Sequence, residues 1–515
     1  MHRRMACRAM LVALACLVVL PLAASAQSSI VGLVRDESGG VLPGVSVEVA
    51  SPALIEKGRT SVTDAQGRYR LADLRRGTYR VTFAAAGFST VVRDGVELPP
   101  NVTATVNAVL APPTARNVTS AATVVPGIRQ ATPDVGGSQL MNQTAMRAHG
   151  ISERNVTQLV DGMMINSEEI NGENLAMWDD ALSRETSVTT SAIPADTAAG
   201  GVCLNIIPKD GGNVISGSVF LGGSNGTWQA SNVTDKLRAR GIKTGNGIAH
   251  VQNFNGSIGG PIRRDTLWFF MAARHTSTDE RVANVPKEII LPDGRVTRGL
   301  VDQFVRDVAL RLTWQIDAKN KLAAMFERMW RWKGKSFAFG QDPRSATHVD
   351  DKKALAGPGE AKWTSTLGST LLFEGGYSTA LNQITSWPQP ENHPARGTPE
   401  WYASTTKTDT ALNADFYPQC AYVTGCTIWG SGLTYDRGVD QRHVVMAAAS
   451  YVTGAHAVKV GVQDTFGKDD QLIDRIGDVY ANFVNGKPQT VTVYNTPMIG
   501  RAHVDYDVGI YAQDT

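Results

Sequence analysis

The feature that most constrains this chain is a strict alternation of apolar and polar side chains in residues 307–316. Successive side chains of a β-strand point to opposite faces, so one face of such a strand would be apolar and the other polar. A strand of about ten residues with one apolar face is what a tilted transmembrane β-strand requires. The apolar face would consist of the even-numbered residues Val308, Leu310, Leu312, Trp314 and Ile316. The other face would consist of Asp307, Arg311, Thr313 and Gln315 with Ala309.

The same pattern recurs in pairs of segments joined by short turns. A soluble β-sandwich or propeller would also alternate, but connections that are alternately tight and long favour a membrane barrel. Residues 307–316 lead through the polar turn 317–320 to an alternating segment with Leu322, Ala324 and Phe326. Residues 251–258 and 267–271 flank a Gly-Gly-Pro turn at 259–265, and residues 444–452 and 458–463 flank a turn at 453–456.

The first residues predict export from the cytoplasm. Three arginines precede the apolar run 10–20, which ends at Pro21, and the small residues Ala24-Ser25-Ala26 precede Gln27. This run is shorter than the roughly 20 residues of a spanning helix and ends in a cleavage-site pattern. Residues 1–26 are therefore predicted to be a secretory signal peptide. Since no later run is apolar enough for a spanning helix, insertion into a membrane would require a barrel.

Charge and cysteine content exclude several classes of protein. Loss of the three signal-peptide arginines changes the formal net charge from +2 to −1, and the remaining basic residues are scattered among acidic ones. A nucleic-acid partner, which would need a clustered basic face, is not expected. Cleavage also leaves three cysteines, Cys203, Cys420 and Cys426, too few for a disulfide scaffold.

Short strands and turns follow from Ile30 to Leu110 and predict a β-sandwich. Residues 45–49 alternate with period two, and polar turns at 63–67 and 75–77 precede segments rich in Tyr, Leu, Val and Phe. With Pro43-Gly44, Gly77 and Gly87-Phe88, this stretch resembles the carboxypeptidase regulatory-like domain, which implies a transthyretin-like fold. Residues 27–112 contain no His or Cys that could hold a metal, so a structural or interaction module is expected rather than a peptidase.

Two blocks follow further along the chain. The first block is the Asp161-Gly162 turn between apolar residues, and the second is the Gly-flanked strand 200–212 that ends in Lys209-Asp210-Gly211-Gly212. In this order after the sandwich, the blocks resemble the plug of TonB-dependent outer-membrane receptors, in particular the Oar-like type in which a regulatory-like sandwich precedes the plug. Receptors of this type carry a short energy-coupling box near the start of the plug. The weak candidate here is Thr123-Val124-Val125, within Ala122 to Val125.

The resemblance implies a mainly β chain with four parts and no cofactor. These are a signal peptide (1–26), a periplasmic regulatory-like sandwich (27–112), a linker and plug (113–213) and the N-terminal part of a transmembrane antiparallel β-barrel (214–515). It also implies a location in the outer membrane. The implied partners are outer-membrane lipid, a TonB-type energy-coupling protein and an extracellular ligand of unknown identity.

A long connection from Tyr377 to Arg437 is the candidate ligand loop because long barrel loops lie on the extracellular side. Its aromatic residues could contact a ligand or pack the loop onto itself, and the sequence favours neither. Cys420 and Cys426 lie in the same loop, and an oxidising compartment predicts a disulfide between them. The aromatic residues are Trp387, Trp401, Tyr402, Tyr417, Tyr422, Trp429 and Tyr435.

No enzyme is expected from the motifs. The string Gly222-Gly223-Ser224-Asn225-Gly226 fits a nucleophile elbow but lacks the strand-turn-helix context which that chemistry needs. Two hypotheses stay open: a receptor that imports its ligand with energy from the inner membrane, and a non-transporting adhesion or matrix protein that is anchored by the barrel.

The chain ends within an alternating segment, residues 508–513. The roughly 300 residues after the plug allow about ten strands, whereas plugged transporters close at about 22. An open edge in hydrocarbon leaves backbone groups unpaired. We therefore expect an incomplete barrel from a C-terminally truncated sequence.

Overall fold

The computed structural model describes residues 28–36, 40–51, 54, 58–85, 91–99, 102–110, 128–130, 140–141, 146–148, 150, 155–167, 177–190, 193–197, 201–291, 293–338, 340–351, 355–368, 370–410, 427–432, 435–453 and 456–514. The predicted signal peptide, the coupling-box candidate Thr123-Val124-Val125, Tyr417, Tyr422 and the predicted Cys420–Cys426 disulfide lie outside these residues. The chain divides into two compact units between Pro112 and Pro113.

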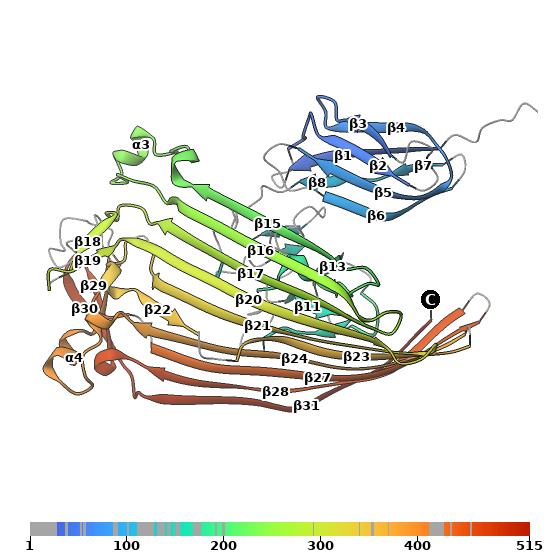
Figure 1. Cartoon of the computed structure of the whole chain (residues 1–515). Coiled ribbons are helices and arrows are strands. Elements are labelled where there is room, and N and C mark those ends of the chain that lie inside the picture. The colour runs from blue at the N-terminus through green and yellow to red at the C-terminus, as the bar shows by residue number, and fades with distance from the viewer. Residues whose placement is uncertain are drawn as a thin grey trace, which may run out of the picture. The chain divides into compact units, whose positions relative to one another are not determined.

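The first unit is a β-sandwich (blue in Figure 1). One sheet has the order β4-β1-β7 with β8 also paired to β1, and the other has the order β3-β2-β5-β6. Its strands are β1 (Ser28–Asp36), β2 (Ser46–Ala50), β3 (Gly58–Val62), β4 (Arg68–Leu74), β5 (Gly77–Ala84), β6 (Val91–Leu98), β7 (Thr103–Thr105) and β8 (Ala108–Leu110).

Alternation places the core of this sandwich between its two sheets. Val47 and Val49 of β2 are fully buried, as the period-two pattern predicts. Tyr69 of β4 meets Phe83 of β5 edge to face with ring centroids 5.6 Å apart, and its hydroxyl donates to the carbonyl of Val106 at 2.7 Å. The predicted sandwich is therefore present, and its buried tyrosine has a hydrogen-bond partner.

The second unit consists of a large curved sheet and a group of smaller strands against its concave side (Figure 1). We call the smaller group the plug. It contains a four-stranded sheet of order β12-β11-β14-β13 and the pair β9–β10. Its strands are β9 (Ile128–Gln130), β10 (Met146–Ala148), β11 (Thr157–Val160), β12 (Met163–Met164), β13 (Ser183–Thr189) and β14 (Cys203–Pro208).

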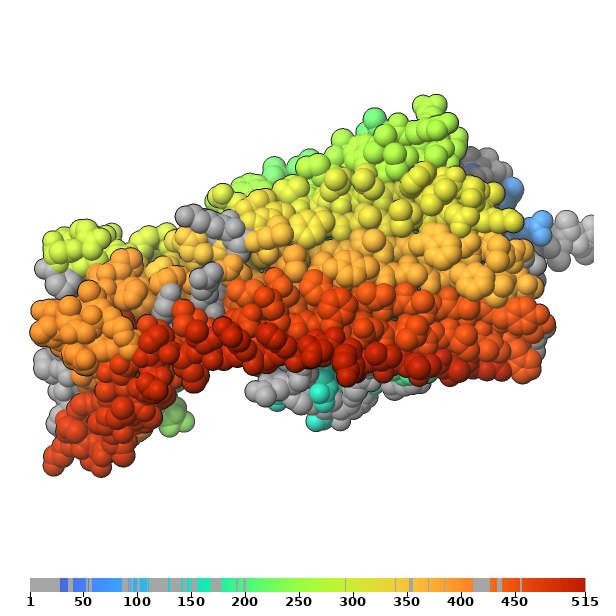
Figure 2. Space-filling view, turned by 90° about the horizontal axis from the view of Figure 1, so that it is seen from below, coloured from blue at the N-terminus to red at the C-terminus, as the bar shows by residue number. Residues whose placement is uncertain are grey.

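Among the described residues the large sheet has eleven strands, and its ends β15 and β31 are not paired to each other. Its strands are β15 (Ser216–Asn225), β16 (Gly247–Arg263), β17 (Leu267–Arg281), β20 (Leu300–Gln315), β21 (Asn320–Ser336), β22 (Thr347–Asp350), β23 (Gly357–Leu367), β24 (Leu371–Pro388), β27 (Tyr435–Thr453), β28 (His456–Asp474) and β31 (Met498–Asp514). Figure 2 shows teal plug residues beyond the dark red edge of the sheet. The sheet is thus an incomplete barrel that does not surround the plug.

The polar and apolar faces of β20 are those that its sequence predicts. Val308, Leu310, Leu312 and Trp314 are 36–45% exposed on the outer face, whereas Asp307, Arg311 and Thr313 are buried on the face toward the plug. A water-soluble sheet would bury its apolar face instead. This inverted arrangement is that of a membrane barrel, with apolar side chains toward lipid and polar ones toward the lumen.

Short turns and long connections alternate between the two ends of the sheet, as predicted. The turns 264–266 and 316–319 join neighbouring strands at one end, where β23 and β24 also follow each other closely. The connections at the other end carry small elements of their own. These are α3 (Asp235–Arg238), β18 (Glu288–Ile290), β19 (Val296–Arg298), α4 (Pro399–Ala403), β25 (Thr406–Asp409), β26 (Ile428–Trp429), β29 (Val479–Val484) and β30 (Lys487–Val493).

Three sequence predictions need correction. The candidate ligand loop does not begin at Tyr377, because β24 continues to Pro388 and places Tyr377 and Trp387 within a strand. The Gly259-Gly260-Pro261 segment is not a turn, since it pairs with β17 up to the bulge before Arg263. The strands of the hairpins are 15–19 residues long rather than about ten.

In the described part of the chain, no helix has the length and hydropathy needed to cross a membrane.

Candidate functional site

The candidate site is the contact between the plug and the polar face of the large sheet. The predicted Asp161-Gly162 turn joins β11 to β12, with Val160 paired to Met163. Both turn residues have positive φ, 47° for Asp161 and 87° for Gly162, which is the requirement of a type I′ hairpin turn. Gly376 of β24 makes room for this hairpin, because a Cβ there would lie 2.5 Å from Sδ of Met163.

Arg311 of β20 is the centre of the largest charged cluster at this contact. Its Nη2 donates to Oδ2 of Asp161 at 2.8 Å, and its Nε donates to Oδ1 of Asp210 at 2.8 Å. Its Nη1 donates to Glu360 of β23. The Arg311 side chain is 5% exposed and that of Glu360 is 1% exposed. One buried guanidinium therefore joins two plug carboxylates to a carboxylate of the sheet.

Asp210 lies just after β14 and joins the plug to two more side chains of the sheet. It accepts from Thr313 Oγ1 at 2.7 Å and from Lys321 Nζ at 2.9 Å. Burial alone would raise the pKa of this carboxyl, but the hydrogen bonds from Thr313, Arg311 and Lys321 outweigh burial and lower the pKa to about 2. Asp210 is therefore ionised at neutral pH.

A second cluster surrounds Arg274 of β17. Its Nε donates to Oδ2 of Asp307 at 2.8 Å, and its terminal nitrogens donate to the carbonyls of Met177 and Trp178 in the plug. Asp179, fully buried, accepts from the amide of Asn255 on β16. The sheet thus binds this part of the plug through backbone carbonyls as well as a carboxylate.

Further polar contacts lie toward the β28 side of the sheet. Lys459 of β28 pairs with plug residue Asp196 at 2.7 Å and with Glu374 of β24 at 3.4 Å. Ser167 of the plug donates to Asp440 of β27. Asp161, Asp196 and Asp210 therefore meet basic side chains that belong to the sheet.

Apolar contact between plug and sheet involves few side chains of the sheet. The apolar core that contains the plug strands includes only four buried side chains of the large sheet among the described residues. Hydrogen bonds and ion pairs therefore position the plug together with this small apolar contact. The four are Phe270, Ala272, Ala309 and Met325.

The described part of the predicted ligand loop packs partly onto itself and partly onto the connection after β28. Trp401 of α4 is 4% exposed and lies under Arg396, whose guanidinium is 4.8 Å from the ring centroid. Trp429 of β26 is 8% exposed and lies 5.5 Å from the Phe483 ring of β29. Tyr402, in contrast, is 58% exposed. The two tryptophans therefore stabilise the loop, and Tyr402 is the one of the three that solvent can reach.

Two other aromatic candidates belong to the strands beside the loop. Trp387 lies near the end of β24, paired with His348 of β22, and its ring lies 6.2 Å from that of His393. Tyr435 is the first residue of β27. Sequence reasoning missed Arg396, which pairs with Asp474 at 2.7 Å and Asp478 at 2.9 Å and so ties the loop to the connection after β28.

No group of three or more His, Cys, Asp or Glu side chains suited to a metal ion occurs among the described residues. The Ser224 string that fits a nucleophile elbow lies in β15, where Ser224 pairs with Val251 of β16.

Comparisons with known proteins agree with the predicted parts. Residues 29–111 match the model of the carboxypeptidase regulatory-like domain. The chain is 28% identical over 283 residues to the TonB-dependent transporter Oar of Myxococcus xanthus, which covers 48% of this chain and 27% of that protein. The chain thus spans about a quarter of the length of this curated relative.

A solved structure shows the same fold over most of the chain. The crystal structure of the outer membrane transporter YddB from Escherichia coli matches with a TM-score of 0.52 at 12% identity, over 78% of this chain and 53% of YddB. Together with the relationship to Oar, this confirms the predicted resemblance to TonB-dependent outer-membrane receptors that carry a regulatory-like domain. The large sheet corresponds to part of an outer-membrane barrel.

Proposed function

We propose that the full-length protein is an outer-membrane receptor that binds an extracellular ligand and imports it. A TonB-type coupling protein would supply energy from the inner membrane by pulling on the segment before the plug, with Thr123-Val124-Val125 as the coupling box. The plug would then leave its position against the sheet and open a path through the lumen. The proposal takes residues 113–213 as linker and plug and residues 214–515 as part of the barrel.

The observation that carries this proposal is the ionic contact around Arg311. A plug that only anchored or filled the barrel could be fixed by a continuous apolar core. Buried ion pairs specify position but add little net stability, because the loss of hydration offsets most of their attraction. When the plug moves, water can enter the lumen and hydrate each separated charge. An interface of this kind can therefore open and close without a large loss of apolar contact.

The ligand would be recognised at the end of the sheet that carries the long connections. Tyr402 is exposed there, while Trp401 and Trp429 hold the surrounding loop in shape. We propose that the Cys420–Cys426 disulfide closes the same loop. Siderophore, glycan, peptide and protein cargo are all compatible with an aromatic loop.

The alternative is a non-transporting adhesion or matrix protein that keeps the barrel as an anchor. The two functions are separated by deletion of residues 113–130 from the full-length gene in its native host. Growth is compared across a panel of single nutrient sources for the intact strain, a strain without the gene and the deletion strain. Heat-modifiability on a gel verifies that the shortened protein still forms an outer-membrane barrel.

If the protein is an importer, the deletion strain should fail to grow on every nutrient on which the strain without the gene fails to grow. If the deletion strain grows like the intact strain on all of those nutrients, energy coupling through this segment is wrong. If loss of the whole gene changes cell adhesion but no nutrient use, the anchor function is correct instead.

A further inference from the structure

A row of four side chains crosses the outer face of the large sheet in direct register. Phe254 of β16 pairs with His275 of β17, His275 pairs with Arg306 of β20, and Arg306 pairs with Trp330 of β21. All four project from the face opposite the plug, since the alternate positions of these strands are buried toward it. An arginine and a histidine thus lie between two aromatic rings on the apolar face.

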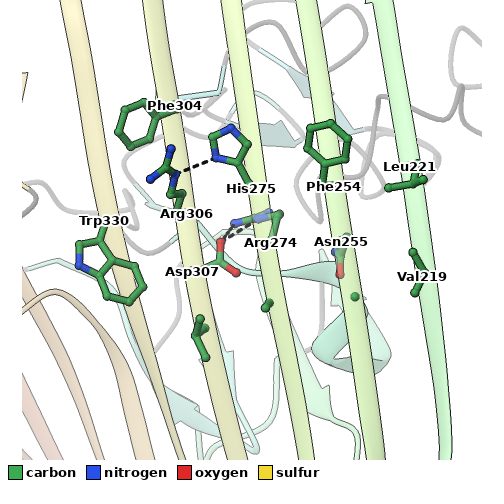
Figure 3. A pocket seen from close by; sticks show the side chains of 13 residues that line it. Val219, Leu221, Phe254, Asn255, Arg274, His275, Phe304, Arg306, Asp307 and Trp330 are labelled. Carbon is green, nitrogen blue, oxygen red and sulfur yellow. Dashed lines mark hydrogen bonds and ion pairs between the residues drawn. The ribbon is translucent and has the colours of Figure 1, made fainter.

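The Arg306 guanidinium is held in a defined position. Its Nε donates to Nδ1 of His275 at 3.0 Å, and its carbon lies 4.7 Å from the centroid of the Phe304 ring (Figure 3). In the described part of the chain, no carboxylate lies within ion-pair distance of Arg306. The guanidinium is therefore oriented by a histidine and an aromatic face, and its positive charge has no counter-charge within that part of the protein.

The depth of Arg306 in the membrane follows from the outward-facing residues on either side of it in β20. On one side the outward residues of β20 are Val308, Leu310, Leu312 and Trp314, a band about 15 Å tall at the usual strand rise and tilt. On the other side lies a further aromatic pair, Phe304 with Trp332 of β21. Aromatic belts mark the level of lipid headgroups. Arg306 thus lies within the belt, at the edge of the hydrocarbon, rather than above it in water.

A hollow in the outer face lies beside this cation on the hydrocarbon side. Its floor has two small residues, Gly256 of β16 and Ala273 of β17, which pair with each other. Val219 and Leu221 of β15 form one wall, and Val308 lies in the opposite wall. Figure 3 shows Phe254 and His275 between Leu221 and Arg306. The hollow is apolar at its base and cationic at its upper end, so it is complementary to a lipid with an acyl chain and an anionic headgroup.

Arg328 of β21 adds a second positive charge near this end. It pairs with Val308 across the strands, two residue pairs closer to the hydrocarbon than Arg306, and its guanidinium lies 5.1 Å from the Trp330 ring. Arginine presents its donors in a planar fork that fits a phosphate with two hydrogen bonds. The Arg328 guanidinium reaches back over the Trp330 ring toward the level of Arg306, and two such cations match an anionic phosphate and not a neutral headgroup.

We propose that this outer face binds the phosphate group of an outer-leaflet lipid, with an acyl chain in the hollow over Gly256 and Ala273. Arg306 and Arg328 contact the phosphate, and His275 positions Arg306 through its ring nitrogen. We call this arrangement the lipid-phosphate site. It requires the sheet to stand in a membrane but is independent of whether the protein imports a ligand.

The test uses the full-length protein purified in detergent and titrated with lipid by native mass spectrometry. The probes are a diphosphorylated lipid A and the same lipid after removal of its phosphates. The wild type should bind the phosphorylated lipid about tenfold more tightly than the dephosphorylated one, and Arg306→Gln should lose about tenfold in affinity for the phosphorylated lipid only. Arg306→Lys should bind at an intermediate level, because it keeps the charge without the fork.

Arg238→Gln is the matched control, since Arg238 is an exposed arginine in a long connection that pairs with Asp235 at 2.6 Å. It should bind both lipids like the wild type, and heat-modifiability verifies that every variant folds. The proposal is overturned if Arg306→Gln and Arg238→Gln bind the phosphorylated lipid equally. It is also overturned if the wild type does not distinguish the two lipids, or if inorganic phosphate alone binds as tightly as the lipid.

Discussion

Replacement of Arg311 by glutamine should release the plug from the sheet. The substitution removes the cation that joins Asp161, Asp210 and Glu360 and leaves three carboxylates near one another in a buried place. Removal of one partner of a buried ion pair typically costs about 3–5 kcal/mol, because the remaining charge loses its compensation. Lys321 remains 2.9 Å from Asp210 and offsets part of this loss, so we expect the lower end, about 3 kcal/mol.

Cys203 reports this release directly. It is a thiol of the plug strand β14 that is 6% exposed, and burial raises its pKa, so we expect it to react faster with a maleimide when the plug opens. If opening precedes labelling, a loss of about 3 kcal/mol accelerates the reaction on the order of a hundredfold. The assay measures the rate of Cys203 modification in purified full-length protein, with the labelled peptide quantified by mass spectrometry.

Arg306→Gln is the matched control because Arg306 lies on the same strand but projects from the outer face. It should leave the rate of Cys203 modification unchanged. If Arg311→Gln reacts no faster than Arg306→Gln while the barrel remains folded, the ionic cluster does not hold the plug, and the argument from buried charge is refuted.

Three more predictions concern single features. Cys420 and Cys426 should both resist thiol labelling in unreduced protein and react after reduction; labelling of both before reduction would exclude the loop disulfide. Because the pKa of Asp210 is lowered from 3.8 to about 2 in the folded plug, its stabilisation is present above pH 3.8 and is lost as the pH falls toward 2. The unfolding temperature of the wild-type plug, measured by calorimetry, should therefore fall as the pH is lowered through this range. The fall should be smaller for Asp210→Asn, and an equal fall in the two proteins would contradict the assignment. Trp429→Ala should destabilise the folded loop by about 3–5 kcal/mol and speed limited proteolysis there, whereas Tyr402→Ala should not; equal rates would show that Trp429 is not a core residue of the loop.

The sequence predicted the faces of the barrel strands but not their full length. Period-two alternation is readable wherever one face meets lipid, as in residues 308–316, because only apolar residues are stable there. Beyond the membrane the outward positions become polar, as at Ser277 and Asp279 of β17, and the alternation disappears although the pairing continues. Strand ends therefore could not be found from hydrophobic pattern alone.

The glycines before Pro261 show a second limit of sequence reasoning. They suggested a turn, whereas the structure uses them for close packing within β16. A Cβ at Gly259 would lie 2.7 Å from the Phe270 ring, and one at Gly260 would lie 2.8 Å from Cγ1 of Ile215. Glycine serves both purposes, and the local sequence does not distinguish them.

The candidate site was predictable only in part. Alternation placed Arg311 and Asp307 toward the lumen, and the Asp161-Gly162 turn was identified as part of the plug. Their meeting was not predictable, since Asp161 and Arg311 are 150 residues apart and no local pattern links them. Ion pairs of this kind depend on how the plug packs against the sheet.

The most direct test of the central claim, that energy from the inner membrane displaces the plug, is the labelling of Cys203 in living cells. Cells that express the full-length protein are treated with a membrane-impermeant maleimide that passes the outer membrane through open channels, with and without a proton ionophore. The account predicts faster modification of Cys203 in energised cells, and no such acceleration when residues 113–130 are deleted. Equal modification with and without the ionophore in the intact protein would contradict it.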